Sequence, residues 1–249
     1  MKQTHNQPFQ DMKKISILLI ISLLMLAVLP SCRKVDGSGP VISETRSISG
    51  FSEIKSDFSG DVYVTQGSIS SIRIEAQRNI IDVIETVLND GILTIRVKSN
   101  TVIRPDSRVR VYVTLPTVTA LRVSGSGNMM IQDVLNTSDL YVKVNGSGNL
   151  DISRLLASSL DANISGSGEI RIYDGSVNYE SVEITGSGSA DCSGLAANTA
   201  SVRISGSGDI RVYALSRLTV KITGSGNVYY RGTPAIDVSI SGSGKLRPM

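Results

Sequence analysis

The chain has 249 residues, with 25 Lys and Arg, 22 Asp and Glu, a single His and no Trp, and its formal net charge is +3 at pH 7. So small an excess of positive charge gives no electrostatic basis for binding nucleic acid. The two cysteines, Cys32 and Cys192, are too few for a disulfide framework. We therefore expect no nucleic-acid partner and no disulfide-stabilised scaffold.

The first 31 residues have the pattern of a secretory signal peptide. Lys13 and Lys14 precede an apolar run over residues 15–29, which is of signal-peptide length and short for a membrane span. The sequence LPSC follows at residues 29–32, and a small residue before a cysteine resembles the bacterial lipoprotein signal. That resemblance implies cleavage before Cys32 and lipid attachment at Cys32, which would hold the protein to a membrane through its N-terminus. An ordinary signal peptide with a chance cysteine is the alternative.

The residues after Cys32 favour the outer membrane. By resemblance to enterobacterial lipoproteins, an aspartate at the next position marks retention at the inner membrane, and Arg33 stands there instead. We expect a lipid-anchored protein of the cell envelope at the outer membrane, on its periplasmic or its outer face. Residues 32–44 are predicted to be a flexible tether, because Gly37-Ser38-Gly39 and the proline after it do not fit the repeats that follow. Cleavage would also remove His5, the only histidine.

From residue 119 to residue 249 the chain repeats itself. The tripeptide Gly-Ser-Gly occurs seven times in this part, at steps of 18 to 21 residues. Regular self-similarity at such a period indicates a stacked repeat architecture. The glycines of the seven units are Gly125 and Gly127, Gly146 and Gly148, Gly166 and Gly168, Gly186 and Gly188, Gly206 and Gly208, Gly224 and Gly226, and Gly242 and Gly244.

Apolar residues stand at fixed places around each unit. Two positions before it stand Val123, Val144, Ile164, Ile184, Ile204, Ile222 and Ile240, and two positions after it stand Met129, Leu150, Ile170, Ala190, Ile210, Val228 and Leu246. Polar residues flank each of these positions, which is the period-two pattern of half-buried strands. One repeat cannot bury its apolar face alone, but stacked neighbours can. The sequence therefore predicts an all-β right-handed parallel β-helix (a β-solenoid) of about 20-residue coils. Its corners would be the glycines, which tolerate positive φ and close backbone approach.

Residues 45–118 are β-rich but less regular, and we assign them to the same domain (45–249) as an irregular N-terminal part. Asn89-Asp90-Gly91 joins the alternating segments 84–88 and 92–97, which predicts a hairpin. Ser59-Gly60-Asp61-Val62 is similar to the pattern that follows the later glycines. We therefore expect the region to contain irregular first coils of the solenoid, and residues 79–83 to form one turn of helix.

No motif of catalysis, cofactor binding or metal binding stands out. The Gly-Ser-Gly units precede strands, whereas phosphate-binding glycine loops precede a helix. Only two of the seven units are followed by an acidic residue, so a calcium-binding solenoid turn is not indicated. Cys192 aligns with the apolar residues Ile152, Ile172 and Val212, and a mature chain without histidine offers it no base. We expect Cys192 to be a buried thiol of the core.

A polysaccharide-acting enzyme is the least favoured function. Charged residues are spread along every coil, and no long loop interrupts the repeats to form the wall of a cleft. One outward column carries four basic residues but is interrupted by an amide and an acid: Arg122, Lys143, Asn163, Glu183, Arg203 and Lys221. In a second column, opposite charges alternate: Asp151, Arg171, Asp191 and Arg211. Such pairs favour the register of the coils, although each exposed pair contributes only about 0.2–1 kcal/mol.

Several segments resemble one known family. Phe51–Gly67, Asn89–Lys98, Val109–Pro116, Gly226–Pro234 and Ser239–Lys245, together with the repeated Gly-Ser-Gly units, are similar to the Putative auto-transporter adhesin, head GIN domain family of Bacteroidetes envelope proteins. The resemblance covers about residues 45–247. It implies a β-helical fold on a lipoprotein or secreted chain, with no catalytic residues to transfer.

We therefore expect a non-enzymatic cell-envelope lipoprotein that presents a solenoid surface for binding or adhesion to a glycan or protein partner. A structural element that associates with copies of itself is the second hypothesis, because terminal coils expose strand edges that can pair. Neither a cofactor nor a metal ion is expected.

Overall fold

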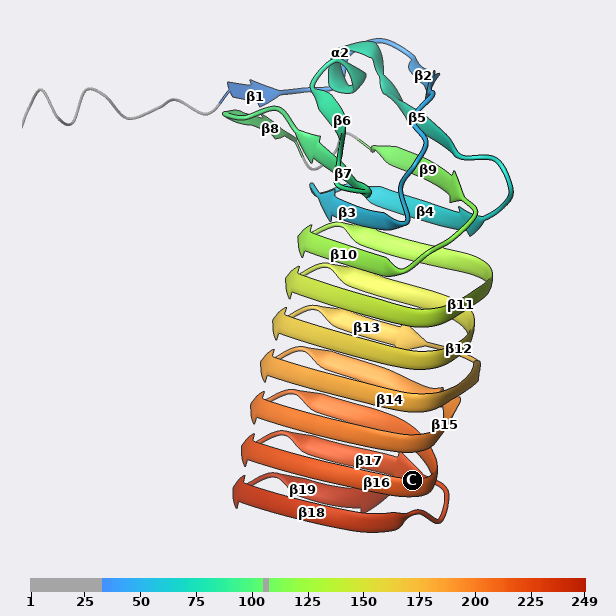
Figure 1. The fold of residues 1–249 in the computed structure, drawn as a ribbon. Coiled ribbons are helices and arrows are strands. Elements are labelled where there is room, and N and C mark those ends of the chain that lie inside the picture. Colours follow the sequence, from blue (N-terminus) through green and yellow to red (C-terminus); the bar gives the residue numbers. More distant parts are fainter. Residues whose placement is uncertain (1–32, 105–107) are drawn as a thin grey trace, which may run out of the picture.

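The computed structural model describes residues 33–104 and 108–249, so the predicted signal peptide and Cys32 lie outside the described residues. The fold has two parts: an irregular cap (residues 33–104 and 108–118) and a regular stack of flat coils (Figure 1). The stack is a β-solenoid of about 6 turns with about 20-residue spacing, which confirms the predicted all-β solenoid. Within the described part of the chain, no helix is long and apolar enough to cross a membrane.

Each coil of the solenoid has two faces joined by a Gly-Ser-Gly corner. Its strands are β10 (Ala120–Gly125), β11 (Asn128–Gly146), β12 (Asn149–Gly166), β13 (Glu169–Ile172), β14 (Gly175–Gly186), β15 (Ser189–Gly206), β16 (Asp209–Gly224), β17 (Asn227–Arg231), β18 (Ala235–Gly242) and β19 (Lys245–Pro248). Neighbouring coils pair in parallel and in register, so that Ile164 lies between Val144 and Ile184. Each inward position therefore continues as one column through the stack.

The inward columns form one continuous apolar core. Val144, Ile184 and Ile204 are completely shielded from solvent, as are Leu150 and Ile210 on the opposite face. Burying one such side chain contributes about 1.5–3 kcal/mol relative to leaving it in water. Stability therefore comes from the stacking of coils, because no single coil encloses its own apolar residues.

The two glycines of each corner have different backbone geometries. The first has a positive φ, from 102° at Gly125 to 135° at Gly206, which is a region that favours glycine. The second approaches the coil before it closely, because a Cβ on Gly188 would lie 2.5 Å from the carbonyl oxygen of Gly168. Backbone hydrogen bonds join successive corners, such as the 2.9 Å bond that the Ser187 N–H donates to the Gly166 carbonyl.

The cap contains the remaining elements: β1 (Arg33–Val35), β2 (Val41–Arg46), β3 (Glu53–Asp57), β4 (Asp61–Gln66), β5 (Ser71–Gln77), α2 (Arg78–Ile81), β6 (Ile84–Asn89), β7 (Ile92–Val97), β8 (Thr101–Ile103) and β9 (Arg110–Leu115). Strands β3 and β4 pair in parallel with β10 and β11, so the cap supplies an irregular first coil, as expected. The predicted hairpin is confirmed: β6 and β7 are antiparallel, and Asp90 and Gly91 have positive φ values of 48° and 76°. The expected turn of helix is α2.

The segment predicted to be a flexible tether is largely strand. β1 pairs with β8, and β2 pairs antiparallel with β5. The physical reason is that β5 offers a free strand edge to β2. Arg46 of β2 also joins this strand to α2 and β6, because it donates to the carbonyl oxygens of Ile81 and Ile84. Val35 of β1 is buried against the core of the cap. The chain is therefore packed into the cap from residue 33 onward, and β1, where the described chain begins, lies at the cap end of the molecule (Figure 1).

Candidate functional site

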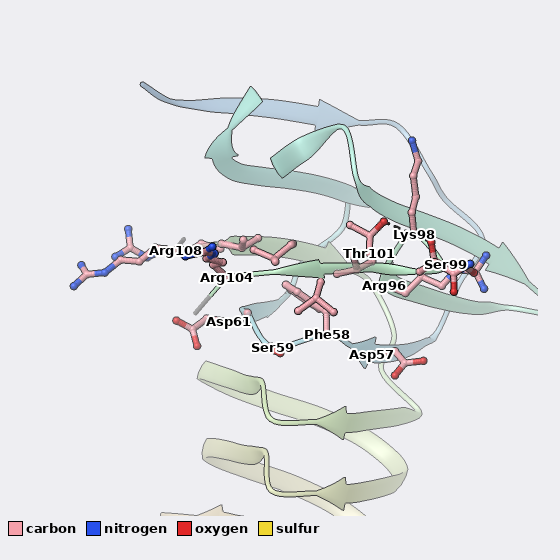
Figure 2. Close-up of a pocket in the computed structure, with 17 residues that line it drawn as sticks. Asp57, Phe58, Ser59, Asp61, Arg96, Lys98, Ser99, Thr101, Arg104 and Arg108 are labelled. Atoms are coloured by element: carbon pink, nitrogen blue, oxygen red, sulfur yellow. Dashed lines mark hydrogen bonds between the residues drawn. The ribbon is translucent and has the colours of Figure 1, made fainter. Parts of the chain in front are cut away.

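The cap contains a pocket with a volume of about 790 Å³. It lies beside the first coil, between the turn that joins β3 to β4, the segment from β7 to β8, and the start of β9 (Figure 2). Its lining residues are Asp57, Phe58, Ser59, Gly60, Asp61, Arg96, Val97, Lys98, Ser99, Asn100, Thr101, Val102, Ile103, Arg104, Arg108, Val109 and Arg110. The segments that form its wall are thus distant in sequence.

Two local features of the backbone shape this pocket. Gly60 lies against the ring of Phe58, where a Cβ would come within 2.2 Å of a ring carbon, so only glycine leaves the ring in place. Asn100 has a positive φ of 58° and ends the turn after β7. That turn is closed by the N–H of Thr101, which donates to the carbonyl of Lys98 at 3.2 Å. Together they fix the position of Phe58 and lead the chain into β8, whose residues line the pocket.

The middle of the pocket is apolar and its ends are cationic. Phe58 and Val109 are buried, and Val102 is exposed. The cations belong to Arg96, Lys98, Arg104, Arg108 and Arg110, against the two carboxylates of Asp57 and Asp61. Figure 2 shows Arg104 and Arg108 at one end, and Arg96 and Lys98 at the other.

Within the described residues, part of this positive charge has no ion-pair partner. Arg96 forms an ion pair with Glu85 (2.9 Å), and Arg104 pairs with Asp36 (2.6 Å). Lys98, Arg108 and Arg110 form no ion pair with any residue of 33–104 or 108–249. Side chains of this kind attract an anionic group, and the apolar floor between them suits an uncharged part of the same ligand.

The pocket adjoins the start of the described chain. The N–H of Arg33 donates to the carbonyl of Asn100 at 2.8 Å, and Asn100 lines the pocket.

A second, more open hollow of about 550 Å³ lies where the cap meets the solenoid. Most of the residues that line it have hydroxyl, amide or carboxylate side chains, including Asp139 and Asp161, and Leu140 and Tyr141 line it as well. Gln66 joins the two parts of the molecule here, because its amide bonds the backbone N–H and carbonyl of Asn136 at 2.9 and 2.8 Å.

The solenoid core contains one titratable pair. Cys192 is fully buried, as its column position predicts. Glu180 is only 3% exposed, and neither of its carboxyl oxygens has a partner in hydrogen-bond geometry, although the Cys192 thiol is close enough to interact with it. Burial raises the pKa of Glu180 to about 8, and burial beside Glu180 raises the pKa of the Cys192 thiol. A protonated thiol beside a protonated acid is a poor nucleophile.

Sequence reasoning missed both Glu180 and the cap pocket. Glu180 stands six residues before a Gly-Ser-Gly unit, at the position of Leu160 and Ala200 in the adjacent coils. Extending the column alignment by two further inward positions along the strand, to residues 182 and 180, could therefore have found it. No comparable sequence pattern marks the pocket, because its cationic residues do not recur at a regular spacing. The glycine corners lie on the solenoid, and among the described residues no group of three or more His, Cys, Asp or Glu could hold a metal ion.

The predicted ladder of alternating charges is formed in part. Arg171 donates to both oxygens of Asp151, at 2.7 and 3.3 Å, and also to Glu169. Asp191 accepts instead from its neighbour Ser193, and the Arg211 guanidinium lies over the Tyr229 ring at 5.3 Å. In this column, therefore, only Asp151 and Arg171 form the expected ion pair between coils.

The last coil differs from all the others because its core is open. Ile236, Val238 and Ile240 of β18 point inward, yet they are 41%, 46% and 41% exposed. In β16, one coil earlier, Leu218 and Val220 hold the same columns and are at most 1% exposed.

These features define a class of protein: a β-solenoid with a pocketed cap at the N-terminal end and an open apolar coil at the other. The chain belongs to the family described as Putative auto-transporter adhesin, head GIN domain, whose model matches residues 50–234. Among curated protein sequences no relative matches the chain.

Crystal structures of similar proteins have the same fold. A putative adhesin from Bacteroides fragilis NCTC 9343 is 24% identical, with a TM-score of 0.80 over 86% of this chain and 100% of that one. A putative adhesin from Parabacteroides distasonis ATCC 8503 is 25% identical, with a TM-score of 0.72 over 87% of this chain and 100% of that one. A protein described as a putative lipid binding protein, also from Parabacteroides distasonis ATCC 8503, is 25% identical, with a TM-score of 0.75 over 87% of this chain and 100% of that one. Membership of an adhesin family indicates a protein of the cell envelope or surface.

Proposed function

We propose that this chain is a non-enzymatic, adhesin-like binding protein of the cell envelope, anchored by a lipid on Cys32 to the outer membrane. The observation that carries the proposal is the polarity of the molecule. Residue 33 is fixed in the cap, and the solenoid extends away from it (Figure 1). A chain anchored at Cys32 would therefore hold its cap near the membrane and its last coil farthest from it.

Two experiments test the anchor and the exposure. Cys32→Ala in the full chain is expected to release the protein from membranes into the soluble fraction, with Cys192→Ala as the matched control that leaves it membrane-bound. Protease treatment of intact cells is expected to degrade the protein, because a partner on another surface must reach it. Retention of the Cys32→Ala protein in membranes, or full protection from protease on intact cells, contradicts the proposal.

The cap pocket favours a second function at the same end of the molecule, which is binding of an anionic lipid headgroup. Lys98, Arg108 and Arg110, which have no ion-pair partner among the described residues, line this pocket together with an apolar floor, and a structural relative is described as a putative lipid binding protein. Residues 33–249 are expected to co-sediment with vesicles of anionic phospholipid more strongly than with neutral ones, and less so as salt rises. Arg108→Glu with Arg110→Glu should weaken that binding at least about tenfold, since each basic residue near an anionic surface contributes about 1 kcal/mol. Equal binding of the unaltered protein to neutral vesicles contradicts this function.

A further inference from the structure

Within residues 33–104 and 108–249, no further coil covers the inward residues of the last coil. Val220 of β16 is 1% exposed because β18 covers it, whereas Val238 of β18 is 46% exposed. Ile236 and Ile240 are exposed in the same way on either side of Val238. Three adjacent aliphatic side chains that belong to core columns therefore lie open at the end of the stack.

The backbone at this end is also available for pairing. β18 pairs with β16 along one edge, and β19 pairs with β17 along one edge. No strand in the described ranges 33–104 and 108–249 pairs with the other edge of either, and Figure 1 shows both strands at the end of the stack. An exposed edge with apolar inward residues is a site for pairing with another strand.

The opposite end of the solenoid cannot serve as that partner. β10 and β11 are covered by β3 and β4, and these are covered in turn by β7 and β9. Ile80 and Ile81 of α2 are fully buried within the cap. Copies therefore cannot stack head to tail into a fibre, and two last coils that meet form a closed two-fold pair.

We propose that the last coil binds the last coil of a second copy of this chain, and that the two copies stand on opposing surfaces. Pairing through the last coils places the two caps at opposite ends of the dimer. Since the anchors would be at the caps, two upright copies in one membrane cannot pair in this way, and copies on facing membranes can. This inference rests on the proposed function and names its partner: the protein adheres to itself.

The charges of the last coil select one of two possible arrangements. The outward residues of β19 are Lys245 and Arg247, and those of β18 include Asp237. In one arrangement, the two-fold axis pairs β19 with β19 of the second copy. This pairing would bring together four cations, which are Lys245 and Arg247 of each copy. In the other arrangement, the two-fold axis runs parallel to the strands, and β18 pairs with β19 of the second copy. This pairing is antiparallel, because the strands on the two faces of a coil run in opposite directions (Figure 1). Asp237 then lies diagonal to the partner's Arg247, a separation of about 7–8 Å that a long side chain can span.

The surface area that the two last coils would bury is consistent with a specific contact of moderate affinity. A strand of 8 residues in β18 is about 26 Å long, and a coil with two sheets about 10 Å apart is about 20 Å wide with its side chains. Each copy would bury about 500 Å², so the total of about 1,000 Å² stands at the lower limit of specific interfaces. Micromolar affinity, strengthened by many copies on each surface, fits such a contact.

Sedimentation equilibrium of residues 33–249, which contain every described element, tests the contact directly. The unaltered protein is expected to form dimers as its concentration rises through the micromolar range, and no larger species. Val238→Arg should raise the dissociation constant at least a hundredfold. Ser201→Arg, which places the same charge on an outward face in the middle of the stack, should leave it unchanged. An unaltered protein that remains monomeric up to about 0.5 mM, or a dimer that Val238→Arg does not weaken, overturns the proposal.

A charge exchange tests the arrangement. Asp237→Arg and Arg247→Asp should each weaken the dimer about tenfold or more, and the double variant should restore it. Each variant is first compared with the unaltered protein by circular dichroism and thermal unfolding, and little change is expected because these residues are exposed. Single variants that have no effect, or a double variant that is no better than either single one, overturn the pairing of β18 with the partner's β19.

An aggregation assay with protein-coated beads distinguishes failure of this inference from failure of the proposed function. Beads that carry the protein by residue 33 are expected to aggregate with one another, and beads that carry it by residue 249 are not, because their last coils are blocked. Aggregation that is equal for both attachments overturns the contact between last coils. The proposed function fails separately, if Cys32→Ala leaves the protein in membranes or if cells protect it from protease.

Discussion

Replacing Glu180 with leucine is expected to stabilise the solenoid, and to do so most strongly at alkaline pH. Glu180 occupies an inward column between Leu160 and Ala200, with no hydrogen-bond partner for its carboxyl oxygens. Leucine has a similar volume and already fills this column at Leu140 and Leu218. The substitution therefore removes a desolvated acid without leaving a large cavity.

The magnitude follows from the pKa. Burial raises the pKa of Glu180 from 4.5 to about 8, and each unit of difference between folded and unfolded states corresponds to about 1.4 kcal/mol. Because the folded state holds the proton more tightly, the stability linked to this group is fully present below about pH 4.5 and is lost as the pH rises through 8. The loss is about 3 kcal/mol at pH 7 and about 5 kcal/mol above pH 8.

Guanidinium unfolding at pH 5, 7 and 9 measures the effect. Glu180→Leu should raise the midpoint at every pH, with the largest gain at pH 9. Glu180→Gln should remove the pH dependence while gaining less, because an amide without partners stays buried. Glu183→Gln, on an outward column, is the control and should change neither stability nor its pH dependence. If the Glu180→Leu protein loses stability between pH 5 and 9 as steeply as the unaltered protein, or is the less stable of the two at pH 9, the reasoning about this buried acid is wrong.

Three further outcomes are expected. Cys192 should resist alkylation at pH 8 in the folded protein and react once guanidinium unfolds it, and rapid labelling of the folded protein would contradict its burial. Gly206→Ala should lower the unfolding free energy by about 3 kcal/mol or more, because a Cβ there would lie 2.2 Å from the Gly186 carbonyl oxygen. Gly125→Ala, with a positive φ but open space around it, should cost only about 1–2 kcal/mol, and equal costs at the two glycines would refute the close-approach argument. Arg171→Met should cost at most about 1 kcal/mol at low salt and less at high salt, since its ion pair with Asp151 is partly exposed.

The solenoid could be predicted because its signal is both local and repeated. The residues two positions from each corner, such as Ile184 and Ile204, show the alternation of a strand, and the fixed period places like residues in one column. Parallel pairing in register then follows from burial alone, since a slip of one residue would expose every inward side chain. The hairpin at Asn89-Asp90-Gly91 was predictable for a similar reason, because its turn chemistry is local.

The cap could not be predicted to the same depth, because its contacts are set by neither period nor turn chemistry. Strand β1 pairs with β8, nearly seventy residues later, and the sequence of residues 33–35 gives no indication of that partner. The pocket is formed by segments near residues 58, 100 and 109 that only the tertiary fold brings together. The sequence of residues 32–44 resembles a tether because the segment is short and contains glycines, and its pairing with β5 depends on the tertiary fold.

The two ends of the molecule differ in a way that the repeats alone do not require. A solenoid of identical coils has two open ends that complement each other, and it would polymerise head to tail. Here the cap closes one end with β3 and β4 and carries the cations of the pocket, while β18 leaves the other end apolar. Lys245 and Arg247 on β19 further disfavour direct contact of that strand with its own copy. This asymmetry would restrict the proposed association to a closed pair with the two caps at opposite ends, which is the geometry that the proposed contact between two surfaces needs.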